Sequence, residues 1–114
     1  MIRHILLIQF TVETSIEQIE AVRIGFLSMP TGVEGVTTVE WGENNSPEGK
    51  NAGYKHCVIM TFTDQQARKR YLHHPKHKAL KDIFRPFLSK LIVFDYNHPS
   101  AIPLSSTVHS LREN

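Results

Sequence analysis

The sequence predicts one α+β domain of the ferredoxin-like type, with the element order β-α-β-β-α-β and an antiparallel sheet. Three observations predict this fold class. The chain has 114 residues, which corresponds to a single domain. Four segments rich in β-branched and aromatic residues alternate in that order with two segments of helical spacing. With 40% hydrophobic residues the chain can bury a core, although so small a protein is often helped by a partner subunit.

The first half of the chain predicts a strand, a helix and a second strand. Met1–Phe10 is a nearly continuous apolar run, typical of a strand that is buried on both faces. A helix begins at Thr14 or Ser15, since each is followed three residues later by the Glu or Gln of a capping box. It ends at Pro30. Val33–Gly42 is rich in β-branched residues and predicts the second strand.

The second half predicts a strand, two helical segments and a last strand. The polar segment 43–53 contains glycine, proline and asparagine and is typical of a connecting loop. Tyr54–Thr63 predicts the third strand. A short helix over 64–72 and a second helical segment over Pro75–Leu88 follow, and Ser89–Tyr96 predicts the fourth strand.

Composition limits the classes of partner and compartment. We expect residues 1–96 to form the domain and residues 97–114 to be a tail that is partly disordered or packs on a partner. A net charge of +2 predicts neither nucleic acid nor a membrane surface as a partner. The single cysteine, Cys57, excludes an intrachain disulfide. The apolar run at the start is too short to span a membrane and has no cleavage site, so we expect a soluble, cytoplasmic protein.

One apolar face of the predicted sheet is left without a cover. The first, third and fourth strands are apolar on both sides, but the two helices of this fold cover only one side. The simplest way to bury the second apolar face is to pack it against the sheet of a second subunit. We therefore expect a homodimer through the sheet face, a dimeric α/β barrel whose interior can hold a small apolar ligand.

The segment Tyr71–His77 (YLHHPKH) is the main candidate for chemistry. Pro75 cannot lie inside a helix but suits the first turn of a new one, with His74 as its cap. Neutral imidazole can take a proton, and a tyrosine hydroxyl can stabilise the oxyanion that forms. Tyr71 and His77 are therefore the predicted catalytic residues, and Asp95 could orient the imidazole. The alternative is that Tyr71 only packs its ring and His77 only bonds the backbone.

Two further histidines lie on apolar strand faces. His4 alternates with Leu6 in the first strand, and His56 alternates with Val58 in the third. Such histidines are most often core residues with satisfied hydrogen bonds. If they point into the barrel, they line a pocket together with His77. The predicted ligand-binding residues are His4, Leu6, Phe26, His56, Val58 and Asp95.

Metal and phosphate sites are not predicted. His73 and His77 are four residues apart, as on one helix face, but Pro75 interrupts the turn between them. No cofactor motif is present, so we expect no cofactor and no native metal site. The basic residues between Arg68 and Lys81 predict a solvated helix face, or an attraction of an anionic ligand toward the bend.

Several segments together resemble the stress-responsive A/B barrel (Dabb) family. The resemblance covers about the first 96 residues and implies a dimeric α+β barrel. The segments that carry it are His4, Trp41-Gly42, Gly53-Tyr54-Lys55-His56, Phe62-Thr63-Asp64, Tyr71–His77 and Phe94-Asp95-Tyr96.

The resemblance also implies a range of functions. A plant branch of the family comprises polyketide cyclases, which close a linear polyketide by aldol condensation and use a tyrosine and a histidine at the spacing of Tyr71 and His77. That branch also has an aromatic hydroxyl on the first helix, where this chain has Phe26. At this position the chain departs from the pattern of that branch.

Three functions remain open from the sequence. The first is a stress-responsive dimer that binds a small, largely apolar ligand. The second is a cofactor-independent acid–base enzyme, a polyketide-cyclase-like aldol cyclase or lyase that uses Tyr71 and His77. The third is a non-catalytic structural or assembly module with a filled interior. An open interior lined by these side chains would support the first two.

Overall fold

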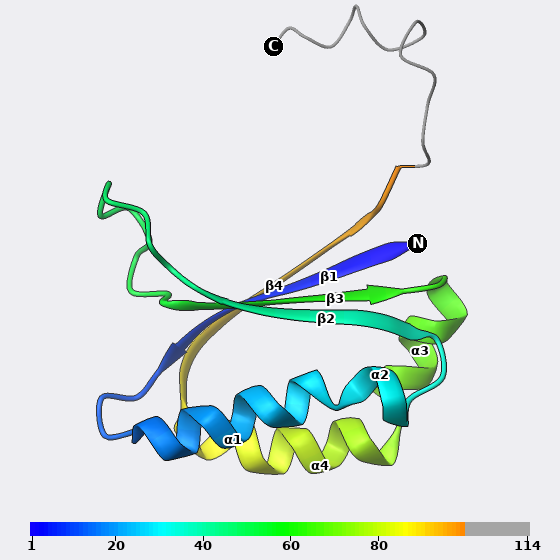
Figure 1. Ribbon diagram of the computed structural model, residues 1–114, viewed down its shortest axis with the longest axis horizontal. Helices are drawn as coiled ribbons and strands as arrows, with labels where there is room; N and C mark the ends of the chain where they lie inside the picture. Colours follow the sequence, from blue (N-terminus) through cyan, green and yellow to red (C-terminus); the bar gives the residue numbers. More distant parts are fainter. Residues whose placement is uncertain (100–114) are drawn as a thin grey trace, which may run out of the picture.

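The fold is a four-stranded sheet with all helices on one face (Figure 1). This computed structural model describes residues 1–99, and most of the predicted tail lies outside the described residues. The elements in chain order are β1 (Ile2–Phe10), α1 (Ile16–Leu27), α2 (Met29–Gly32), β2 (Val36–Glu43), β3 (His56–Phe62), α3 (Gln65–Leu72), α4 (Pro75–Phe84), the 3-10 helix η1 (Arg85–Phe87) and β4 (Leu88–Asn97).

The sheet confirms the predicted ferredoxin-like topology. Its strand order is β2-β3-β1-β4, and every neighbouring pair is antiparallel. In the register, His4 of β1 lies opposite Met60 of β3 on one side and opposite Asp95 of β4 on the other. β1 and β4 therefore lie side by side, which brings Asp95 next to His4.

Local sequence signals start the helices where they were predicted. Ser15 makes the capping box with Gln18, so the second of the two predicted pairs begins α1. The Asp64 carboxylate accepts from the backbone N–H of Ala67 and begins α3. His74 precedes Pro75 and accepts from the N–H of Lys76 through Nδ1 (3.0 Å), as a cap should.

Element boundaries differ from the prediction at two prolines. Pro30 does not end the helical region, because it is tolerated in the first turn of the separate helix α2. β2 consequently begins at Val36 instead of Val33. The second helical segment, predicted to run to Leu88, ends as α4 at Phe84, and the chain continues through Pro86 as η1.

The core lies between the inner face of the sheet and the helices. Alternate residues of β1 and β3 are buried there, as the two-residue period predicts. α1 buries Val22 and Phe26 against the core, while Ile16 in its first turn remains 82% exposed. The largest buried side chains of the core are Ile8, Val22, Val33, Val58, Met60, Phe62 and Tyr71.

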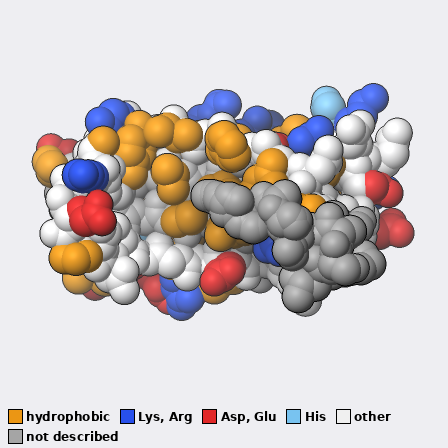
Figure 2. Space-filling model, turned by 90° about the horizontal axis from the view of Figure 1, so that it is seen from above, with side chains coloured by type: hydrophobic (Ala, Val, Ile, Leu, Met, Phe, Trp, Pro, Cys, Tyr) orange, Lys and Arg blue, Asp and Glu red, His pale blue; other side chains and the backbone are white. Residues whose placement is uncertain are grey.

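The outer face of the sheet is apolar and uncovered in the single chain. Phe94 pairs with Ile5, and Ile92 pairs with Leu7, so apolar side chains continue from β4 to β1 on this face. Phe94 is 61% exposed. Figure 2 shows hydrophobic side chains gathered over this side of the molecule. Among residues 1–99, no helix combines the length and the hydrophobicity that a membrane span requires.

Candidate functional site

A cavity of about 360 Å³ lies between the inner face of the sheet and the helices α3 and α4. It exists because the helices pack mainly against β2 and β3, which leaves the inner face of β4 uncovered. Val93 is 51% exposed there. The walls of the cavity are largely apolar, and the apolar residues that line them include Leu6, Phe26, Leu80, Phe84, Leu91 and Val93.

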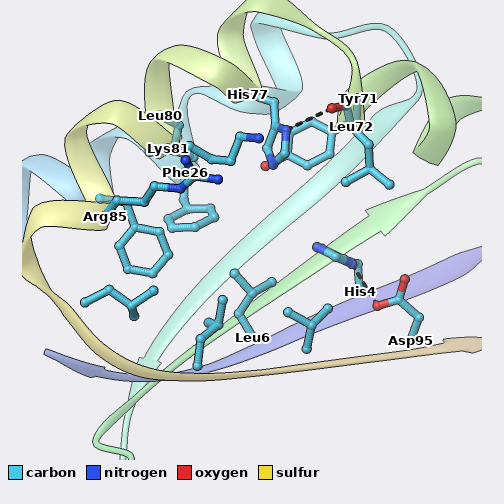
Figure 3. Close-up of a pocket in the computed structure, with 14 residues that line it drawn as sticks. His4, Leu6, Phe26, Tyr71, Leu72, His77, Leu80, Lys81, Arg85 and Asp95 are labelled. Carbon is cyan, nitrogen blue, oxygen red and sulfur yellow. Dashed lines mark hydrogen bonds and ion pairs between the residues drawn. The ribbon is translucent and has the colours of Figure 1, made fainter.

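Tyr71 and His77 lie next to each other at one wall of this cavity. Their ring centroids are 4.5 Å apart, although Pro75 separates them in the chain. Tyr71 lies in the last turn of α3 and His77 in the first turn of α4, so the bend folds the two rings together. Figure 3 shows both on the helix side of the cavity, with His4, Leu6 and Asp95 on the sheet side.

The His77 imidazole is held by the backbone. Its Nδ1–H donates to the carbonyl oxygen of Leu72 at 3.1 Å. Because a carbonyl only accepts, Nδ1 carries the proton and Nε2 keeps a free lone pair. Burial lowers the pKa of His77, with smaller contributions from the charges of Lys81 and Arg85. The side chain is therefore neutral near pH 7 and can accept a proton at Nε2.

Asp95 orients a different histidine from the predicted one. Its Oδ1 accepts from Nδ1–H of His4 at 2.7 Å, and its Oδ2 accepts from Arg68 at 3.1 Å. The role that the sequence suggested for Asp95 toward His77 is thus filled by the Leu72 carbonyl. The antiparallel register explains this, since His4 and Asp95 are direct partners across β1 and β4. His4 is a buried histidine with a fixed tautomer that faces the cavity.

Tyr71 is almost fully buried, at 1% exposed. Its ring packs against Phe62, His4 and His77. Burial raises the pKa of its phenol well above the ordinary value, so the hydroxyl stays protonated and can donate. Among residues 1–99, no hydrogen bond occupies this hydroxyl.

The structure brings six of the eight predicted site residues to the cavity. These are His4, Leu6, Phe26, Tyr71, His77 and Asp95. His56 does not join them, because it pairs with Ile8 and Glu43 farther along the sheet and contacts the rings of Phe10 and Trp41. Val58 is completely buried in the core and has no surface to offer a ligand.

The histidines of the bend bond the backbone through Nδ1. His73 donates to the carbonyl of Lys69 at 2.9 Å, while His74 and His77 make the contacts described above. Within the described part of the chain, no three His, Cys, Asp or Glu side chains gather in a way that could hold a metal ion.

Comparison with known proteins identifies the family. The family described as Stress responsive A/B Barrel Domain matches residues 2–98 of this chain. The chain belongs to this A/B barrel family. The family predicted from the sequence is confirmed, and so is the ferredoxin-like fold.

Two curated plant relatives are similar over most of their length. The stress-response A/B barrel domain-containing protein HS1 of Arabidopsis thaliana is 32% identical over 103 residues, which cover 90% of this chain and 94% of the relative. The olivetolic acid cyclase of Cannabis sativa is 28% identical over 95 residues, which cover 83% of this chain and 94% of the relative.

Solved structures share the fold closely. A crystal structure of an Arabidopsis thaliana protein is 31% identical, with a TM-score of 0.83, and the match covers 90% of this chain and 100% of the other. Two more distant structures show the fold alone. A hydroxynitrile lyase from Passiflora edulis is 20% identical (TM-score 0.81, 90% and 96% covered). A dimeric ferredoxin-like protein from Jannaschia is 21% identical (TM-score 0.76, 85% and 98% covered).

In this A/B barrel chain, sequence reasoning missed two cations of the cavity. Lys81 and Arg85 both line it. Lys81 was grouped with the basic residues around the bend, and Arg85 was not singled out. The available signal was position: the two are four residues apart and each directly follows an apolar residue of the α4 stripe, Leu80 or Phe84.

Proposed function

We propose that this A/B barrel protein binds a small, largely apolar ligand in the cavity between sheet and helices. The observation that carries the proposal is the open cavity itself, about 360 Å³ in volume, with apolar walls and a few polar groups. Ligand sites of proteins have this composition, because apolar area supplies affinity and a few polar groups fix orientation. The sequence led us to expect the ligand in the barrel interior between two sheets, but this cavity lies on the helix side of the sheet.

The proposed form is a homodimer through the outer face of the sheet. The exposed Ile92, Phe94 and Tyr96 form an apolar surface with the side chains of β1 beside them. An apolar surface of this kind commonly marks an interface. The Jannaschia protein of the same fold is described as dimeric. This dimer is the barrel arrangement that the sequence led us to expect.

Filling the cavity tests the binding proposal. The neutral probe is 4-butylbenzamide, and its binding is measured by isothermal titration calorimetry. We expect Val93→Trp to weaken binding about tenfold or more, because the indole would occupy the space that the probe needs. Ile16→Trp is the matched control, since Ile16 is 82% exposed on α1 outside the cavity. Absence of binding by the parent protein would refute the proposal.

A second candidate function is cofactor-independent acid–base catalysis of the aldol-cyclase type. It is favoured by the free Nε2 of His77 beside the unoccupied hydroxyl of Tyr71. The similarity to olivetolic acid cyclase supports it independently. Phe26 supplies no hydroxyl to the cavity, so we propose the reaction class and leave the substrate of the relative aside.

The geometry suggests a sequence of proton transfers. His77 Nε2 would take a proton from a carbon between two carbonyl groups, which makes that carbon nucleophilic. The carbon would attack a second carbonyl of the same chain, so a C–C bond forms and the attacked oxygen gains negative charge. The Tyr71 hydroxyl would donate a hydrogen bond to that oxygen. The proton held by His77 would then return to the oxygen, which restores the neutral imidazole.

Separating binding from turnover distinguishes the two candidates. The probe substrate is a linear poly-β-ketoacyl thioester of N-acetylcysteamine, and ring formation is followed by chromatography. If the protein is an enzyme, His77→Gln should abolish cyclisation while binding of 4-butylbenzamide stays within about twofold of the parent. If the parent does not accelerate ring closure, binding remains the function and catalysis of this type is refuted.

A further inference from the structure

Lys81 and Arg85 are cations in a cavity whose other walls are largely apolar. They are four residues apart and lie on the same face of α4 and its continuation into η1. Figure 3 shows both side chains extending along the cavity in the direction of His77. Lys81 is partly buried, while Arg85 lies at the solvent side.

Neither cation has a carboxylate partner within residues 1–99, where the ion pairs involve other groups. Two other cationic side chains nearby do have carboxylate partners. Arg68 is paired with Asp95, and Lys78 is paired with Asp82 at 3.1 Å. Like charges four residues apart on a helix repel each other, and a bound anion would relieve this repulsion.

Among the described residues, the one carboxylate that lines the cavity cannot neutralise them. Asp95 already accepts from His4 with one oxygen and from Arg68 with the other. The positive charge of the two cations also reaches His77, whose pKa they help to lower. The cavity therefore carries an excess of positive charge close to the proposed acid–base pair.

We propose that Lys81 and Arg85 form an anion-binding subsite, and that the ligand of the cavity is an apolar molecule bearing one carboxylate. This inference rests on the proposed function, since it names the charge of the ligand of the same cavity. The apolar part of the ligand lies against the walls from α1, α4 and the sheet. Its carboxylate receives charge-assisted hydrogen bonds from the two cations, which are stronger than neutral ones.

The experiment compares two probes of one shape. The anionic probe is 4-butylbenzoate and the neutral one is 4-butylbenzamide, both measured by isothermal titration calorimetry on the full chain. We expect the parent to bind the benzoate about tenfold more tightly than the amide, as charge-assisted hydrogen bonds in a partly buried site allow. The double variant Lys81→Gln and Arg85→Gln should lose that preference while binding the amide within about twofold of the parent.

Two control variants separate this subsite from general basicity and from misfolding. Lys78→Gln removes a cation of the same helix that is paired with Asp82, and it should keep the preference for the benzoate. Lys81→Arg keeps the charge and should also keep it. Equal binding of the two probes by the parent overturns the inference but leaves the proposed function intact. Binding of neither probe overturns both.

Discussion

The imidazole of His77 lies 4.5 Å from the ring of Tyr71, centroid to centroid, and its Nδ1–H is bonded to the carbonyl of Leu72. This arrangement depends on the proline bend, because an uninterrupted helix would place residues six apart on different faces. The bend ends α3 at Leu72 and restarts the chain at Pro75. It thereby aims a neutral base and a protonated phenol at the same cavity.

The ring and the hydroxyl of Tyr71 should have separable roles. The ring is buried among His4, Phe62 and His77, so Tyr71→Ala should lower the free energy of unfolding by about 3–5 kcal/mol. Tyr71→Phe keeps the ring and should stay within about 1 kcal/mol of the parent, since no group among residues 1–99 bonds the hydroxyl. Urea unfolding measures both values. An equal loss in the two variants would contradict this division.

Asp95 should stabilise the fold through its two partners. Asp95→Asn leaves Arg68 without its charge partner and weakens the bond from His4, so we expect a loss of about 1 kcal/mol in the free energy of unfolding. The control is Asp82→Asn, which removes an exposed i,i+4 ion pair and should leave the urea midpoint unchanged. If both substitutions have the same effect, the pairing across β1 and β4 contributes nothing specific.

The free energy of unfolding should decrease as the pH falls below the ordinary pKa of histidine. Burial lowers the pKa of both His56 and His77 in the folded protein, so the unfolded chain binds protons more readily than the folded one. The stabilisation is complete above the unfolded pKa of about 6.5 and is lost as the pH falls from there toward the folded values. Urea midpoints at pH 7.5, 6.5 and 5.5 measure this trend.

The variant His56→Gln tests how much of this pH dependence comes from the His56 side chain. His56 has a buried Nδ1 without a hydrogen-bond partner within residues 1–99, so its protonation is poorly accommodated. His56→Gln should make the dependence of the urea midpoint on pH shallower between 6.5 and 5.5. An unchanged slope in this variant would exclude His56 as a source of the effect.

The order of elements and the alternation within strands could be predicted because they follow from local physics. The capping residue of α3, the bend at Pro75 and the buried face of β1 depend on neighbours in the sequence. The partner of Asp95 could not be predicted in this way. It is set by the pairing of β1 with β4, which are separated by most of the chain, and by a register that fixes His4 as its neighbour.

The residues that line the cavity could be predicted better on the strands than on the helices. His4 and Leu6 followed from alternation, while Lys81 and Arg85 belong to a helix face whose orientation depends on packing. His56 and Val58 show the limit of alternation, since it gives the face of a sheet but not the position along it. The helices cover β2 and β3 and leave β4 open, and no local signal encodes that offset.

The apolar outer face of the sheet should hold two chains together. Phe94 is 61% exposed on β4, beside Ile5 of β1, so an aspartate at this position would place charge in the proposed interface. We expect Phe94→Asp to shift the protein from twice the chain mass to the chain mass in light scattering after size-exclusion chromatography. Ile16→Asp is the control, because Ile16 is 82% exposed on α1, away from the sheet. A parent protein that is monomeric at all concentrations, or a Phe94→Asp variant that stays dimeric, would rule out this interface. Since the cavity opens on the inner face of the sheet, the monomeric variant should still bind the benzoate probe.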